Sequence, residues 1–184
     1  TREEQDQFAW NSQLRARTAD DAGKFKDEIV PISIKTRKGE VIFDKDEFIN
    51  RGTSYEKLSQ LRPAFKKDGS VTAGSSSGIN DGASFLLLAS DEAVKKYNLT
   101  PLFEVVGIGQ GGVDPSIMGL GPTPAIKQAL KTANLSFNDI ELLELNEAFA
   151  AQSLGVIREL TDAFGVSKEE ILEKTNVNGG AIAL

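Results

Sequence analysis

The sequence predicts an α/β protein, and two observations lead to that fold class. From about residue 83 onward, short apolar segments of strand length alternate with segments that carry helix signals. The apolar segments are 83–89, 102–112 and 139–146. Residues 1–75 do not share this alternation, so they are interpreted as an inserted or separate loop region.

The chain begins with a predicted helix over residues 1–22. Thr1 and Glu4 have the spacing of a capping box, in which each side chain accepts from the other residue's backbone N–H. Acidic residues also crowd the first turn, where the helix dipole favours negative charge. The pair Ala22–Gly23 is expected to end the helix, because glycine readily adopts the left-handed backbone of a helix terminus.

Two short extended segments are predicted around a turn at Lys38–Gly39. Pro31 argues against a central strand at this place, because proline cannot donate a hydrogen bond to a neighbouring strand. Residues 47–69 are expected to be irregular, with one short helix.

Three further helices are expected, each after one of the apolar segments. Residues 91–98 place their acids first and their lysines last, as the helix dipole favours. Residues 121–135 open with prolines, which the first helical turn accommodates. Residues 147–160 begin directly after the third apolar segment with a run of small residues.

The composition excludes several classes of function for these residues. There is no Cys and no His among 184 residues, which excludes disulfides, thiolate zinc sites and catalysis by a Cys or His of this chain; no metal site is expected. The net charge of −6 argues against a general nucleic-acid role, and no apolar run reaches the ~20 residues of a membrane helix. No signal or transit pattern is visible, so a cytoplasmic location is expected. Because the chain starts at Thr1 and its only methionine is Met118, we expect a piece of a longer protein.

The junction "LELNEAFAAQ" is the first candidate for a functional site. Ligand sites of open α/β sheets gather at the carboxyl ends of strands, and Asn146 follows such a segment. Its amide could hold a water or a carbonyl oxygen, and the small residues after it would let a ligand come close. The alternative is structural, with Asn146 as the N-cap of the next helix and Glu147 in its first turn.

The second candidate is the segment "TAGSSSGINDGA", residues 72–83. Loops rich in Gly and Ser offer N–H and hydroxyl groups to a polar ligand, but they are also common as plain turns. The segment matches neither a Walker loop nor a dinucleotide fingerprint. Residues 35–67 hold nine Lys or Arg against five acids, which suits either a phosphate-bearing ligand or an ordinary solvated surface.

Taken in order, several motifs together resemble the thiolase family, most closely its acetyl-CoA acetyltransferase branch. The motifs are "KFKDEIVP", "LRPAF", "VTAGSSSGINDGA", "GGVDPSIMGLGPTPAIKQAL" and "NEAFAAQ". The resemblance implies part of a five-layered αβαβα fold with an inserted loop domain. It assigns residues 1–79 to most of the loop domain, 80–100 to the end of the N-terminal half and 101–184 to the first part of the C-terminal half.

The activity implied by the resemblance is reversible Claisen condensation of two acetyl-CoA to acetoacetyl-CoA and CoA through an acyl-cysteine. Coenzyme A thioesters are then the substrates, no further cofactor is expected, and the protein is expected to form a homodimer or tetramer. The family's nucleophilic Cys would precede Thr1 and its Gly-His-Pro motif would follow Leu184, so this chain alone is expected to be inactive.

The resemblance also assigns roles to individual residues. Asn146 would hold the water of an oxyanion hole, and Ser77 would hydrogen-bond the pantetheine arm. Arg51 lies next to Asn50, the position where the family has an arginine that helps to hold the coenzyme. The remaining candidates would line the coenzyme channel (Phe65, Ala73, Ser76, Ile79), border the acyl pocket (Met118) or lie beside the thioester (Ala148, Phe149).

Two other functions stay open from the sequence. The first is a non-catalytic relative that binds acyl-CoA or lipid, in which the nucleophile has been replaced. The second is an interaction module produced by truncation. A Cys upstream of this segment would favour the enzyme.

Overall fold

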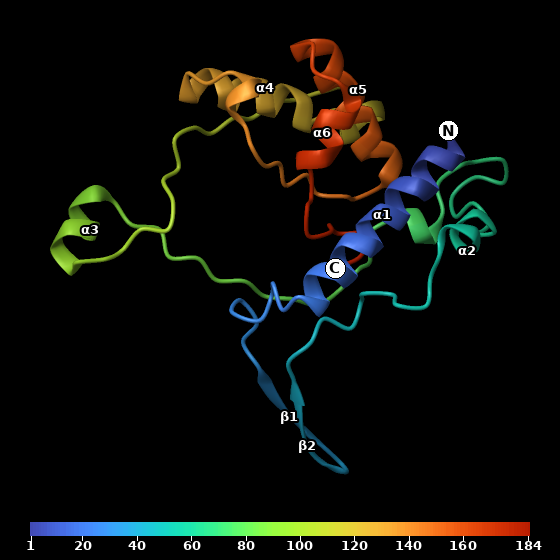
Figure 1. Ribbon diagram of the computed structural model, residues 1–184, viewed down its shortest axis with the longest axis horizontal. Helices are drawn as coiled ribbons and strands as arrows, with labels where there is room; N and C mark the ends of the chain where they lie inside the picture. Colours follow the sequence, from blue (N-terminus) through green and yellow to red (C-terminus); the bar gives the residue numbers. More distant parts are fainter.

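A computed structural model describes residues 1–184, which form a helical body with two projections (Figure 1). Its elements in chain order are α1 (Arg2–Asp21), β1 (Ile32–Thr36), β2 (Gly39–Phe43), α2 (Tyr55–Ser59), the 3-10 helix η1 (Ala73–Ser75), α3 (Asp91–Tyr97), η2 (Pro115–Leu120), α4 (Pro122–Ala133), η3 (Phe137–Asp139), α5 (Ala150–Phe164) and α6 (Lys168–Lys174). No helix is both long and apolar enough to cross a bilayer.

The first helix confirms the expected caps. The Thr1 side chain accepts from the backbone N–H of Glu4, the reciprocal bond is also present, and Ala22 is the C-cap. Gly23 follows with a φ of 68°, a left-handed conformation in which a side chain would be strained. The helix lies against α2, η1 and α5, so it joins the early and late parts of the chain (Figure 1).

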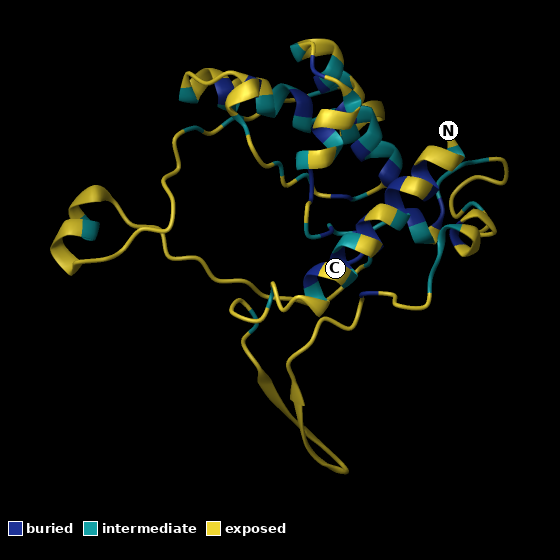
Figure 2. Cartoon of the chain, viewed as in Figure 1, coloured by how far each residue is buried: buried dark blue, intermediate teal, exposed yellow.

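The predicted extended segments form an antiparallel hairpin of β1 and β2. Its register pairs Ile32 with Phe43 at the open end and Thr36 with Gly39 beside the turn. Every residue of both strands is exposed, and the hairpin projects from the body (Figure 2). The short helix expected within residues 47–69 is α2.

The core is built around α5. Its buried Ser153, Val156, Ile157 and Leu160 recur at helical spacing, which directs one face of the helix inward. Ala150 of the same helix also belongs to the core cluster, and its other members come from the surrounding helices and loops: Phe8, Ala9, Leu58, Leu130, Phe137, Val166, Ile171 and Ile182. Figure 2 shows this burial concentrated where α1, α5 and α6 meet.

The three strands predicted at 83–89, 102–112 and 139–146 do not form in this chain. Residues 83–89 are extended and unpaired, with Phe85 99% exposed. Residues 139–146 contribute only one bridge, between Leu143 and Thr175. A strand is completed by a ladder of backbone hydrogen bonds to a neighbour, and no other segment of this chain supplies more than the two bonds that Leu143 makes with Lys174 and Asn176.

The helices predicted after the apolar segments are present. Ser90 caps α3 by accepting from the backbone N–H of Ala93, and Asn98 ends it in the left-handed region. Prolines open α4, and Asn134 ends it in the same way. Figure 1 shows α3 apart from the body at the end of two extended segments. The division of the chain at residues 79 and 100 stays a prediction.

Candidate functional site

The segment from Pro63 to Ser76 folds through its own hydroxyl groups. Pro63 and Thr72 form an antiparallel bridge, and the backbone N–H of Thr72 donates to Ser75 Oγ at 3.0 Å. Ser76 Oγ donates to the carbonyl of Thr72 at 2.7 Å. The turn interpretation therefore holds for Ser75 and Ser76, whose hydroxyls stabilise the loop itself.

The neighbouring Ser77 differs, because its hydroxyl makes no hydrogen bond within the chain and stays free for a ligand. Its backbone N–H donates to the carbonyl of Ala148 at 3.0 Å, and Ser76 forms a bridge with Phe149. The ring of Phe65 meets that of Phe149 edge to face, with centroids 5.8 Å apart. The structure thus brings together five of the residues that the sequence singled out.

Asn146 is not a helix cap, so that alternative is wrong. The N-cap of α5 is Phe149, and the helix starts only at Ala150. The side chain of Asn146 is exposed and makes no hydrogen bond within the chain, whereas Glu147 after it is buried. An exposed amide without a structural partner is free to donate to a ligand or a water.

The remaining candidates have no hydrogen bond or ring contact with this junction. Ala73, Ile79 and Met118 are exposed, with Met118 on η2, which packs against α5. Arg51 forms ion pairs with Asp20 and Asp21 at the end of α1, and these raise the pKa of its guanidinium. The basic residue suggested for the coenzyme is therefore neutralised by two carboxylates in this structure.

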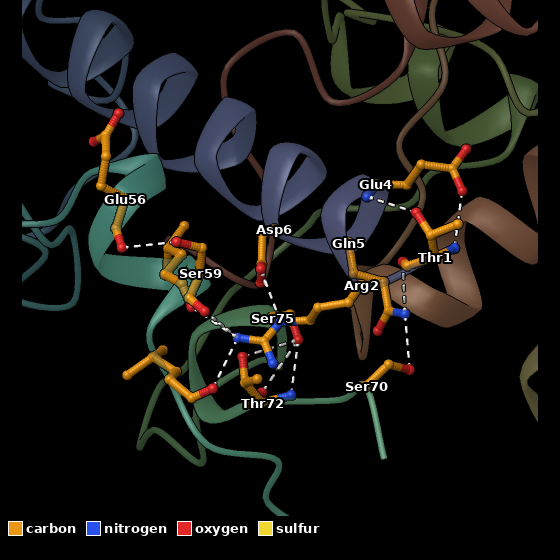
Figure 3. A network of polar contacts seen from close by, with 12 residues as sticks. Thr1, Arg2, Glu4, Gln5, Asp6, Glu56, Ser59, Ser70, Thr72 and Ser75 are labelled. Carbon is orange, nitrogen blue, oxygen red and sulfur yellow. Dashed lines mark hydrogen bonds and ion pairs between the residues drawn. The ribbon is translucent and has the colours of Figure 1, made fainter. Parts of the chain in front are cut away.

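Arg2 fastens the loop that leads to this junction, a role that no sequence motif indicated. Its Nε donates to Asp6 Oδ2 at 2.7 Å, and its Nη2 donates to the carbonyls of Leu58 at 2.9 Å and Leu61 at 2.8 Å. Figure 3 shows the guanidinium pointing from α1 toward the end of α2. Gln5, one turn along α1, donates to Ser70 Oγ at 3.0 Å.

Acidic residues surround Asn146 on both sides. Partial desolvation, and to a smaller extent the charge of Glu147, raises the pKa of the Glu144 carboxyl. Glu147 itself is 2% exposed and accepts hydrogen bonds from Ser12, Asn176 and Ile182. The arrangement can present a neutral donor to a ligand, but it contains no group suited to act as a nucleophile.

Comparison with known families identifies these features. Residues 1–92 match the N-terminal domain of thiolase, and residues 99–184 match its C-terminal domain. The chain belongs to the thiolase family. The resemblance stated from the motifs is confirmed, and the α/β fold class is that of the thiolases.

Individual thiolases are similar over the whole of this chain. It is 52% identical to the acetyl-CoA acetyltransferase of Syntrophomonas wolfei, covering 100% of this chain and 45% of that protein. The crystal structure of the Bacillus anthracis acetyl-CoA acetyltransferase matches with a TM-score of 0.91 and 49% identity, covering 100% of this chain and 45% of the other. Human mitochondrial 3-ketoacyl-CoA thiolase in complex with CoA matches with a TM-score of 0.87 and 49% identity, covering 100% and 44%.

The chain therefore spans a little under half the length of these thiolases. Within that part of the fold, the segments 83–89, 102–112 and 139–146 have no neighbouring strand beyond the bridge between Leu143 and Thr175. Sequence reasoning found the Ser77 and Asn146 loops through their motifs, but it missed Arg2 and Glu147. Apart from Asp6, four residues after Arg2, the partners of these two residues lie far away in the sequence, so no local pattern marks their roles.

Proposed function

We propose that the intact protein is an acyl-CoA acyltransferase that condenses two acetyl-CoA reversibly to acetoacetyl-CoA and CoA. The observation that carries the proposal is the exposed side-chain amide of Asn146, which caps no helix and lies shortly before Ala148, the residue whose carbonyl accepts from the backbone N–H of Ser77. Thiolase relatives that are about half identical over the whole chain support it. One of them is described as a complex with CoA, which supports coenzyme A as the ligand.

The role of Asn146 follows from its chemistry. An amide can donate hydrogen bonds but does not take up a proton near neutral pH, so it acts neither as nucleophile nor as base. Placed directly or through a water beside the thioester oxygen, it would stabilise the negative charge that develops there. The small side chain of the half-buried Ala148, on the same loop, would leave space for the approach of a thioester.

The coenzyme is assigned to the loop on the other side of the junction. The free hydroxyl of Ser77 would hydrogen-bond an amide of the pantetheine arm. Phe65 and Phe149 would provide an apolar wall, and both rings have exposed surface. Ala73, Ser76 and Ile79 extend the proposed channel, Met118 borders the acyl pocket, and Arg51 would reach the phosphates only by exchanging its carboxylate partners.

A nucleophile and a base must come from outside residues 1–184, because this chain has no Cys and no His. The proposed step is attack of a thiolate on the acetyl-CoA carbonyl, which releases CoA and leaves an acetyl thioester on the enzyme. Residues 1–184 then supply binding and charge stabilisation only. A homodimer or tetramer and a cytoplasmic location belong to the same proposal.

The test is thiolysis of acetoacetyl-CoA by the full-length protein and its Asn146→Ala variant. Loss of one oxyanion donor should lower kcat by about 10²–10³ with a much smaller change in KM. Asn146→Asp is the matched control, because aspartate keeps the size of asparagine, but its carboxylate has no donor and cannot stabilise an oxyanion. We expect it to be as impaired as Asn146→Ala.

Four outcomes would count against the proposal. A raised KM with unchanged kcat in Asn146→Ala would make the residue a binding contact. Full activity in Asn146→Asp would show that the reaction needs no hydrogen-bond donor at position 146. Tight binding of CoA without any turnover by the unaltered protein would favour the non-catalytic acyl-CoA-binding relative. Activity on longer 3-ketoacyl-CoA instead of acetoacetyl-CoA would reassign the substrate within the family.

A further inference from the structure

Glu147 is a buried carboxylate that has no Lys or Arg partner. It is 2% exposed, and three donors converge on it instead. Ser12 Oγ donates to Oε2 at 2.6 Å, the backbone N–H of Ile182 donates to Oε2 at 3.2 Å, and Asn176 Nδ2 donates to Oε1 at 2.8 Å. A buried charge is tolerated when hydrogen bonds satisfy it in this way.

The network has a fixed direction. The Asn176 amide accepts from the backbone N–H of Leu145 at 2.8 Å and donates to the carbonyl of Leu145 at 2.7 Å. These two bonds prevent the amide from turning over, so its Nδ2 must face Glu147. Ser12 Oγ in turn accepts from the backbone N–H of Gly180 at 3.1 Å, which leaves its proton for the carboxylate.

The network joins three segments that are distant in the sequence. Ser12 lies on α1, Glu147 precedes α5, and Asn176 begins the turn that contains Gly180 and Ile182. The turn is held close, because a Cβ at Gly180 would collide with the carboxyl of Glu147.

These contacts immobilise the backbone on both sides of Asn146 but leave its side chain free. Leu145, the residue before it, is held by two hydrogen bonds to Asn176. Glu147, the residue after it, is held by its carboxylate. We propose that Glu147 is a positioning residue that fixes the direction of the Asn146 amide in the acyl-transfer site. This inference rests on the proposed function of Asn146.

The structure predicts that Glu147 affects turnover more than binding. The coenzyme loop touches the same junction through the Ser77–Ala148 hydrogen bond. However, that loop is held independently by the bonds within Thr72–Ser76 and by Arg2 and Gln5 of α1. Loosening Glu147 should therefore misplace Asn146 while the coenzyme loop keeps its shape.

The experiment compares steady-state thiolysis by the full-length protein with that of Glu147→Gln, Asn146→Ala and the double variant. In Glu147→Gln an NH₂ group must face either Asn176 Nδ2 or the donors at Oε2, so the network cannot be restored. We expect kcat to fall about tenfold and KM to change less than about twofold. In the Asn146→Ala background the same change should cost less than about twofold, because the group that Glu147 positions is already absent.

Two further variants complete the design. Glu141→Gln is the matched control, since Glu141 is an exposed carboxylate of the same segment with no hydrogen bond or ion pair, and we expect it to be fully active. Ser12→Ala removes one of the three donors, and it replaces Glu147→Gln if that variant does not fold. Its kcat should fall about threefold, with the same loss of effect in the Asn146→Ala background.

Amide hydrogen exchange tests, without an enzymatic assay, whether Glu147 holds the backbone around Asn146. In Glu147→Gln the N–H groups of Leu145 and Ile182 should exchange at least about tenfold faster, and that of Ser75 should be unchanged. Unchanged kcat, a loss that adds fully to that of Asn146→Ala, or unchanged exchange would each overturn the inference. An unaltered kcat in Asn146→Ala would instead overturn the proposed function, and the positioning role with it, even if exchange in Glu147→Gln were accelerated.

Discussion

Replacement of Arg2 by methionine tests how α1 supports the coenzyme loop. Met keeps much of the length and apolar character of the stem but removes every donor of the guanidinium. The Asp6 side chain, 2% exposed, would lose its only ion-pair partner. The carbonyls of Leu58, Ser59 and Leu61 at the end of α2 would lose the hydrogen bonds that they accept from Arg2 (Figure 3).

The size of the effect follows from the burial of the pair. Removing one partner of a fully buried ion pair costs about 3–5 kcal/mol. The Arg2 side chain is 23% exposed, so solvent reduces the value, and the released carbonyls near the surface can bind water. We expect the local free energy of opening to fall by about 2–4 kcal/mol, since a charge left buried dominates the loss.

The assay is native-state hydrogen exchange of the full-length protein, followed in peptides that cover residues 55–75. A loss of 2 kcal/mol corresponds to about 30-fold faster exchange, because each 1.4 kcal/mol is a factor of ten. Arg62→Met is the matched control, since Arg62 is an exposed arginine of the same segment without a hydrogen bond or ion pair. Equal exchange in the two variants would refute the view that Arg2 fastens this loop.

Three further predictions follow from the site. Ser77→Ala should weaken CoA binding several-fold, since it removes one neutral hydrogen bond of about 0.5–1.5 kcal/mol, and Ser77→Phe should nearly abolish it; unchanged calorimetric titration of Ser77→Phe would remove the loop from the site. Glu144 has a raised pKa, so its ionised form opposes folding, and this penalty appears as pH rises from the ordinary carboxyl pKa of 4.5 through the folded-state pKa. Glu144→Gln should therefore unfold at a higher urea concentration than the unaltered protein at pH 7 but not below pH ~4; a higher midpoint at both pH values would contradict this assignment. Residues 1–184 alone should show no thiolysis, and turnover within about tenfold of the full-length protein would show that a Cys and a His are not required.

Local interactions explain where the sequence was sufficient to predict the structure. The capping box of Thr1 and Glu4, the turn before Gly39 and the order of acids and lysines along α3 each depend on residues within a few positions of one another. Such contacts form in the same way wherever the segment lies in a fold. The motifs likewise placed Ser77 and Ala148 in one site, and the structure joins them.

Long-range contacts explain where the sequence was not sufficient to predict the structure. The apolar segments 83–89, 102–112 and 139–146 have the composition of strands, but a strand exists only beside a neighbour, and this chain provides no more than the single bridge between Leu143 and Thr175.

Asn146 had the chemistry of a cap, yet α5 starts at Ala150 because Glu147 is drawn inward to Ser12, 135 residues away, and to Asn176. The sequence by itself determined the helices, the hairpin and the chemical identity of the site, since these follow from neighbouring residues. Only the tertiary structure decided which residues hold that site in place, because the buried carboxylate of Glu147 and the guanidinium of Arg2 gain their partners when distant segments pack together.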